Sequence, residues 1–270
     1  MQRTCCTRAE IYGALLHASV FSHKEIRLSA ENMTVVRRLQ ALLQRAFFVE
    51  CEPQKAGRKQ QLVLTEPAQI GRVFDALGYD CKSHITYHIN RNLLEEDCCI
   101  ASFLRGAFLM GGTVAGPDKK SHLELKTAHQ SLSGEETSLM LDLGLSPKQA
   151  RRGSAYLLYF KDGASAEDFL TRIGAPHAAM ELMQKNRIPF GVSICYTSKN
   201  YRVVTSDEFL DLLISKGCYF AWYFHYMPVG MGAATDLLLT PEQRAYMKDR
   251  VREIRGLTGG KEIFAIDFQN

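Results

Sequence analysis

The chain has 270 residues, 46% of them hydrophobic and 23% charged, which is the composition of a globular protein with one large or two ordinary domains. No apolar run reaches the roughly 20 residues of a membrane span, and no secretion leader precedes Cys5, so we expect a cytoplasmic protein with reduced thiols. Residues 1–187 hold 24 basic and 20 acidic side chains, whereas 188–270 hold nine of each. This asymmetry weakly favours an acidic partner for the first part, and an ordinary solvated surface is the alternative.

The first predicted elements occupy residues 4–78. Thr4 is expected to cap a helix, and the segment 24–30 alternates between apolar and polar residues as a half-buried strand does. After this strand the pattern predicts a helix over 31–47, a turn over 54–59 and a strand over 60–65. The last element of this part is a helix over 70–78, which ends at Gly78.

The same order of elements returns after position 93. Asp97 is expected to cap a second helix. The elements predicted after it are a strand over 121–127, a helix around 135–143, a strand and turn over 153–163, and a helix over 166–174. The sequence therefore predicts an α+β body with pseudo-two-fold symmetry, whose two repeats cover residues 3–92 and 93–184.

Each repeat opens with two adjacent cysteines and continues to a Gly-Ala pair at the same spacing. The cysteine pairs are Cys5–Cys6 and Cys98–Cys99, and the Gly-Ala pairs are Gly13–Ala14 and Gly106–Ala107. Glycine inside a helix costs about 1 kcal/mol relative to alanine, so we expect these two helices to cross closely there. Adjacent cysteines suit neither a disulfide framework nor a CxxC zinc site. We interpret them as small buried hydrophobic residues, with a thiol switch as the alternative.

Two helices with this glycine spacing, each leading into a small sheet, resemble the LAGLIDADG fold of homing endonucleases, with LRGAFLMGG (104–112) in the place of that motif. Over about residues 3–184 the chain also resembles the WhiA family of bacterial regulators. The motifs that carry this resemblance are DCC (97–99), KKSHLEL (119–125), YLLYFKDG (156–163) and DFLTRIGAPHAAMELM (168–183). The resemblance implies a DNA-binding transcription regulator of sporulation and cell division. WhiA-like proteins also carry a helix-turn-helix domain after the repeats and a helix before the cysteines, and we recognise neither here.

Homing endonucleases of this fold need a carboxylate at the end of each motif helix, because these carboxylates hold the divalent ions that activate water. The corresponding positions here are Ala18 and Gly111. Leu109 lies where the LAGLIDADG motif has its other acidic residue. Asp118 lies nearby, but it follows a Gly-Pro turn, where an aspartate ordinarily serves the turn. The sequence therefore predicts that the nuclease fold is kept and its site lost, so that the protein is not an enzyme and holds no metal or cofactor.

If the nuclease site is lost, DNA binding is the function that the resemblance still implies. In DNA-binding proteins of the LAGLIDADG fold, the open face of the sheets lies along duplex DNA, and the helices pack against the opposite face. We expect phosphate contacts from outward strand positions and basic turns, with weak, largely non-specific and salt-sensitive affinity. Protein partners in transcription are a further expectation, and for each residue alone a solvated surface charge is the alternative. The expected contacts are Arg27, Lys55, Arg58, Lys59, Lys119, Lys120, His122 and Lys126.

The last third of the chain has a different pattern. Two capped helices, over 205–217 and 240–256, alternate with apolar strands, which indicates parallel β/α units. The predicted strands are the nearly continuous apolar runs 188–197, 218–227 and 262–268. Three motifs here resemble the middle of a radical S-adenosylmethionine enzyme barrel: IPFGVSICYTSKNY (188–201), FAWYFHYMPVG (220–230) and FAIDFQN (264–270).

Such enzymes hold a four-iron cluster on a CxxxCxxC loop. Cys195 and Cys218 are 23 residues apart, so we expect them to be core residues of an incomplete β/α barrel segment over 188–270 without an iron site. A fragment of such an enzyme is the rival to the DNA-binding interpretation. The two patterns meet within 178–192, which indicates a fused or misassembled reading frame, and a genuine fusion is the alternative that stays open.

Overall fold

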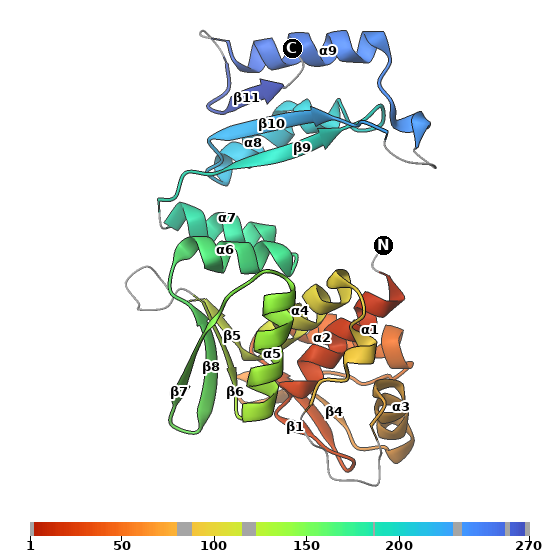
Figure 1. The fold of residues 1–270 in the computed structure, drawn as a ribbon. Coiled ribbons are helices and arrows are strands. Elements are labelled where there is room, and N and C mark those ends of the chain that lie inside the picture. The colour runs from red at the N-terminus through yellow and green to blue at the C-terminus, as the bar shows by residue number, and fades with distance from the viewer. Residues whose placement is uncertain are drawn as a thin grey trace. The chain divides into compact units, whose positions relative to one another are not determined.

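The computed structural model describes residues 3–79, 88–114, 123–185, 187–228, 234–256 and 260–267. Contacts between residues divide the chain into two compact units, Met1–Pro176 and His177–Asn270, and each is described by itself. Among the helices so described, none combines the length and the apolar character that spanning a bilayer requires. Figure 1 shows the elements of both units.

The first repeat folds as a four-stranded antiparallel sheet with three helices. Its elements are α1 (Thr4–Leu16), β1 (Val20–Phe21), β2 (Ile26–Ala30), α2 (Met33–Phe47), β3 (Gln54–Ala56), β4 (Lys59–Leu64) and α3 (Pro67–Leu77). The Asn32 side chain caps α2 by accepting a hydrogen bond from the Thr34 amide. Gly78 ends α3 in the left-handed conformation, at a φ of 74°, as its position predicted. Thr4 is the first residue of α1, and Arg3 holds the cap position that we predicted for Thr4.

The second repeat has the same order of elements. They are η1 (Arg91–Leu93), α4 (Asp97–Gly111), β5 (Gly112–Val114), β6 (Leu123–Thr127), α5 (Gln130–Asp142), β7 (Lys148–Arg152), β8 (Ala155–Phe160) and α6 (Gly163–Arg172). Strand β7 was not predicted, because all five of its residues are exposed and no apolar alternation marks it. Glu96, not the predicted Asp97, is the cap of α4.

The two sheets repeat one topology. Their strand orders are β1-β2-β4-β3 and β5-β6-β8-β7. Arg27 of β2 pairs with Val63 of β4, and Lys126 of β6 pairs with Leu157 of β8. The alternate residues of these strands are buried beneath the helices: Ile26, Leu28, Leu62 and Leu64 in one sheet, and Leu123, Leu125, Leu158 and Phe160 in the other. The predicted pseudo-symmetric α+β body is therefore confirmed.

Helices α1 and α4 cross at the glycines that the repeat places in both. A Cβ atom at Gly13 would lie 2.0 Å from the Phe103 carbonyl oxygen, and one at Gly106 would lie 1.8 Å from the Glu10 carbonyl oxygen. Neither distance is possible for a real side chain, so only glycine allows the two backbones to approach this closely. The expected close crossing is confirmed.

The C-terminal unit is a three-stranded parallel sheet with helices. Its elements are α7 (Pro176–Lys185), β9 (Gly191–Tyr196), η2 (Val203–Thr205), α8 (Asp207–Ser215), β10 (Phe220–His225), η3 (Thr235–Leu237), α9 (Pro241–Ile254) and β11 (Phe264–Asp267). The strand order is β11-β10-β9. The Thr240 hydroxyl and the Gln243 side chain form a reciprocal capping box at the start of α9. The predicted parallel strand–helix order is confirmed.

The apolar strands of this unit pack on one face. Ile194, Tyr196, Ala221, Tyr223 and Ala265 are buried in a core that also includes Met183 of α7. On the other face, Phe224 and Phe264 of β10 and β11 are exposed. The continuous apolar pattern therefore does not reflect burial on both faces, which is where such patterns ordinarily arise.

Nothing in this unit supports its assignment to a radical S-adenosylmethionine barrel. The described part of the unit contains three parallel strands. Cys218 is buried, as expected, but Cys195 is exposed rather than in the core. The unit's core draws on Met183 of α7, a helix that runs into the predicted junction at 178–192, so this helix and the strands after it form one packed body. A misassembled junction is likewise unsupported.

Candidate functional site

The residues expected to contact DNA divide between the outer face of the two sheets and the ends of their hairpins. Alternation along β2 and β4 places Arg27 and Lys59 on the outer face, opposite the buried Leu28 and Leu62. Lys126 lies on the outer face of the second sheet, between the buried Leu125 and Thr127. The strand geometry therefore puts basic side chains on the same face of both sheets.

The first basic hairpin is formed by β3 and β4. Lys55 is paired with Gln60 in the ladder, Arg58 follows Gly57 in the turn, and Lys59 opens β4. Gly57 has a φ of 63°, which a turn this tight requires and glycine adopts without strain. All three basic side chains are exposed, and no carboxylate of the described residues forms an ion pair with them. Their charges are therefore available to an outside anion.

Arg27 is placed differently. Its guanidinium forms an ion pair with Glu25, so part of its charge is already balanced within the sheet. Lys126, at the matching position of the second sheet, is exposed. The remaining expected contacts, Lys119, Lys120 and His122, lie outside the described residues, as does Asp118.

A second basic hairpin lies at the corresponding place of the second repeat, and the sequence analysis missed it. Lys148, Arg151 and Arg152 belong to β7, and all three are exposed. The Arg151 guanidinium stacks 5.5 Å from the centre of the Tyr156 ring, and Arg152 lies 3.4 Å from Glu124. The register sets Lys148 opposite Tyr159 and Arg152 opposite Ala155, on the outer face of the sheet. The similarity of KQARRG (148–153) to QKAGRK (54–59) could have revealed this hairpin.

The far ends of α1 and α4 hold the positions where the nuclease carboxylates would lie. Next to Ala18, the His17 Nε2 lies 2.6 Å from Glu136 Oε1 of α5, and both side chains are almost fully buried. A Cβ atom at Gly111 would lie 2.6 Å from His17 Nδ1 and 2.7 Å from the Lys126 carbonyl oxygen. Burial, and secondarily the charge of His17, lowers the pKa of His129. A histidine thus fills the place that a carboxylate at position 111 would need.

The middle of the two-helix crossing contains a buried carboxylate. Glu10 accepts hydrogen bonds from Arg38 Nε (2.5 Å) and Arg38 Nη2 (2.9 Å) of α2, and from Arg105 Nη2 (2.7 Å) of α4. Arg105 also donates to the Ile173 carbonyl oxygen at 2.7 Å. This network connects α1, α2 and α4 and gives the buried charge two cationic partners.

The near ends of α1 and α4 bring the two cysteine pairs together. The Sγ atoms of Cys5, Cys6, Cys98 and Cys99 all lie within 4.8 Å of one another. Among the described residues, this is the one group of three or more histidine, cysteine or acidic side chains whose ligand atoms converge. Cys6 and Cys99 are buried, as expected, but Cys5 is exposed and Cys98 is half-buried, so the pairs are not simply core residues.

Comparison with known proteins finds similarity to the WhiA proteins. A sequence model described as the WhiA LAGLIDADG-like domain matches residues 100–189. The chain is 33% identical over 198 residues to the "Probable cell division protein WhiA" of Alkaliphilus metalliredigens, covering 67% of this chain and 62% of that protein. It is 32% identical over 190 residues to the protein of the same name from Ruminiclostridium cellulolyticum, covering 66% of this chain and 60% of that protein. The chain therefore spans about three fifths of these curated relatives.

A solved structure shares the fold. The crystal structure of full-length DUF199/WhiA from Thermatoga maritima superposes with a TM-score of 0.52 at 18% identity, covering 70% of this chain and 61% of that one. The chain therefore has the α+β, LAGLIDADG-like fold of that structure, and its sequence is similar to WhiA proteins.

Proposed function

We propose, from the WhiA LAGLIDADG-like domain that this chain carries, that the protein is a WhiA-type regulator that binds duplex DNA and does not cut it. The observation that carries the proposal is the repetition of an exposed basic hairpin. Lys55, Arg58 and Lys59 mark one repeat, and Lys148, Arg151 and Arg152 mark the other. Two cationic hairpins related by a pseudo-dyad suit a ligand that is itself two-fold symmetric and carries negative charge along its length.

Binding in this proposal is mainly electrostatic. The hairpins supply phosphate contacts, and Arg27, Lys126 and the other outward side chains extend them over the sheet face. Such contacts position a duplex but carry little sequence information, so we expect weak and largely non-specific affinity. Lys119, Lys120 and His122 remain part of the proposed surface. A cytoplasmic location and protein partners in transcription belong to the same proposal, since DNA and reduced thiols are found together in a bacterial cytoplasm.

The absence of catalysis is proposed from the packing around Gly111. Homing endonucleases need carboxylates at the two helix ends, because these hold the metal ions that activate water. At Gly111 there is no room for a Cβ atom, and His17 and Glu136 are bound to each other beside it. Among the residues that the structure describes at this end of the helices, Glu136 is already paired with His17, and a divalent ion finds no pair of carboxylates to bridge.

Fluorescence anisotropy with a labelled duplex, titrated with the full chain at several salt concentrations, tests the binding. We expect a Kd in the range of about 10⁻⁶ to 10⁻⁴ M near physiological salt, and the affinity should fall steeply as salt rises. Replacing Arg58 and Lys59 together with alanine should reduce the slope of log K against log salt by up to about 0.9 for each phosphate that these side chains neutralise.

A matched control removes two charges from a different surface. Arg37 and Arg45 are exposed on α2, which covers the sheet from behind. The Arg37→Ala/Arg45→Ala variant should bind with the wild-type slope. Equal loss in the two variants would mean that net charge alone drives binding and would contradict a hairpin interface.

Catalysis has its own test. Plasmid DNA incubated with the purified chain and Mg²⁺ or Mn²⁺ should remain supercoiled, because the residues at the two motif positions, Ala18 and Gly111, offer no carboxylate. Metal-dependent nicking that copurifies with the protein and disappears in an Asp118→Asn variant would contradict this prediction and point to a relocated metal site.

A further inference from the structure

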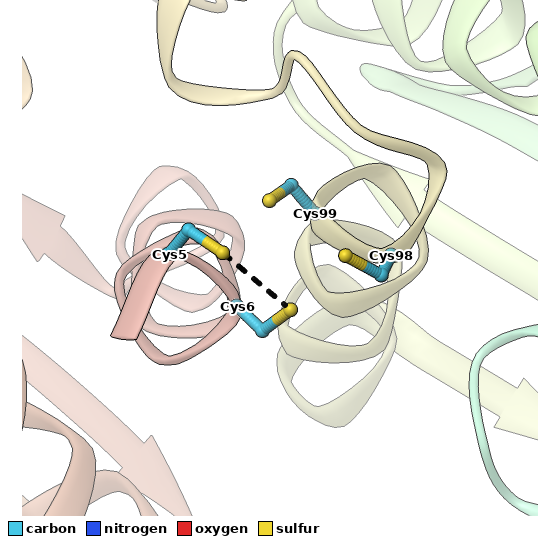
Figure 2. A group of neighbouring side chains, drawn as sticks. All are labelled: Cys5, Cys6, Cys98 and Cys99. Carbon is cyan, nitrogen blue, oxygen red and sulfur yellow. Dashed lines mark hydrogen bonds between the residues drawn. The ribbon is translucent and has the colours of Figure 1, made fainter. Parts of the chain in front are cut away.

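The four cysteines at the pseudo-dyad form a compact group of sulfur atoms. Cys5 and Cys6 lie in the first turn of α1, and Cys98 and Cys99 lie in the first turn of α4. Figure 2 shows the side chains of each helix directed toward those of the other. The Cys5 and Cys6 Sγ atoms are 4.0 Å apart, and all four Sγ atoms lie within 4.8 Å of one another. Each repeat therefore contributes two thiols to one site.

This spacing suits a single tetrahedral metal ion. Zn–S bonds of about 2.3 Å place the four sulfurs of a tetrahedral site about 3.8 Å apart, a small contraction from the distances here. An iron–sulfur cluster needs wider spacing, because several irons and inorganic sulfides lie between the thiolates. Among common metals, four thiolates around one centre favour zinc.

The surroundings favour bound thiolates. Positions in the first turn of a helix face the positive end of the helix dipole, and here the first turns of two helices meet. A cation among the sulfurs would offset the repulsion between the four thiolates.

An opening leads to the site. A cavity of about 160 Å³ is lined by Cys5 and Cys99 together with Arg8, Asn92, Glu95 and Glu96. Glu95 and Glu96 would attract an approaching cation, and Arg8 would balance part of the net negative charge of a four-thiolate zinc centre.

We propose that Cys5, Cys6, Cys98 and Cys99 bind one Zn²⁺ ion. The thiol protons pass to solvent as four S–Zn bonds form, and no oxidation state changes. With four protein ligands and no open position the site is structural, and it ties the first turns of α1 and α4 together across the pseudo-dyad. The proposal does not depend on DNA binding, and its test does not use DNA.

The test measures metal in the full chain, prepared with reductant, incubated with Zn²⁺ and desalted. We expect one zinc per chain by elemental analysis in the wild type. The Cys5→Ser/Cys98→Ser variant replaces the two more accessible thiols, one from each helix, and should retain less than about a tenth of that amount. Cys51→Ser is the matched control, because Cys51 is half-buried elsewhere in the same unit, and it should keep the full complement.

Two further measurements do not depend on the folding of any variant. Co²⁺ added to the wild-type chain should give the visible d–d bands of a tetrahedral ion and an intense thiolate-to-cobalt charge-transfer band. Removal of zinc with a chelator should lower the wild-type Tm by about 5–10 °C, since ligands that bind the native state stabilise it.

Each of the following results would overturn the proposal. They are a wild-type chain that takes up no stoichiometric zinc, equal zinc in the double variant and the Cys51→Ser control, an octahedral cobalt spectrum, and uptake of iron with an iron–sulfur chromophore in place of zinc. A disulfide between the two helices in a zinc-free chain purified with reductant would also overturn it, and would assign the thiols a redox role instead.

Discussion

Glu10 is the clearest example of a single residue that holds several elements together. It is fully buried at the α1–α4 crossing and accepts hydrogen bonds from both Arg38 and Arg105. Replacing it with glutamine would keep its shape but leave two guanidinium groups without a counter-charge. Because the side chains of Arg38 and Arg105 are 43% and 20% exposed, water compensates part of this loss.

We therefore expect Glu10→Gln to lower the free energy of unfolding by about 2–3 kcal/mol, as measured by urea denaturation. Glu50→Gln, at an exposed position of the same repeat, serves as the control and should change stability by less than about 0.5 kcal/mol. Similar stability of Glu10→Gln and wild type would show that the network does not hold the crossing together.

His129 provides a pH-dependent test at the same scale. Burial lowers its pKa in the folded chain, so the unfolded chain binds this proton more readily than the folded chain. The sign follows from linkage: the contribution of His129 to stability is complete above the unfolded pKa of about 6.5 and is lost as pH falls through and below that value.

Urea denaturation at about pH 7.5 and about pH 5 should therefore show a smaller pH-dependent loss of stability in His129→Gln than in wild type. The comparison uses the difference between the two proteins, so acidic groups that titrate in both cancel. An equal or larger loss in the variant would mean that His129 is not the group responsible.

Among the contacts between elements, the α1–α4 crossing sets two effects of a glycine-to-alanine replacement against each other: the gain in helix propensity and the steric overlap of the new methyl group. Helix propensity alone predicts that alanine at a helical glycine adds up to about 1 kcal/mol. At Gly13 and Gly106, however, the new Cβ atom would lie 2.0 Å and 1.8 Å from backbone carbonyl oxygens of the other helix. We expect the steric term to win, because backbone cannot move aside as a flexible side chain can.

Gly13→Ala and Gly106→Ala should each destabilise the chain by about 2 kcal/mol or more in thermal or chemical denaturation. Gly134→Ala in α5 is the matched control, since no other group lies within 4 Å of the position that its methyl group would take, and it should be neutral or stabilising. If all three variants behaved alike, the close crossing would not contribute to stability.

Element prediction succeeded where the chain alternates and failed where it does not. The α2 and β2 segments bury one face each, so their patterns were informative. Strand β7 buries no residue and is held by its ladder with β8 and by polar side-chain contacts, so no hydrophobic pattern could reveal it. The second basic hairpin was missed for the same reason.

At the scale of the whole molecule, the repeat was the most informative feature of the sequence. The matching cysteine and Gly-Ala pairs predicted the pseudo-dyad, and the structure brings both features to the α1–α4 crossing. The convergence of the four thiols could not be predicted from the sequence. The spacing within each cysteine pair does not show how near the two pairs lie until the directions of the two helices are known. The C-terminal unit was predicted as parallel strands, but its apolar pattern did not show that one sheet face is left exposed.

In the proposed complex, both hairpins contact one duplex. The measurement that tests it most directly compares four full-length proteins by duplex anisotropy against salt: wild type, Lys55→Ala/Arg58→Ala/Lys59→Ala, Lys148→Ala/Arg151→Ala/Arg152→Ala, and the six-fold variant. If each hairpin makes phosphate contacts, each triple variant lowers the slope of log K against log salt by up to about 2.7, and the six-fold variant lowers it by the sum of the two. Wild-type slopes in both triple variants would contradict the claim and leave the repeats as a scaffold for protein partners.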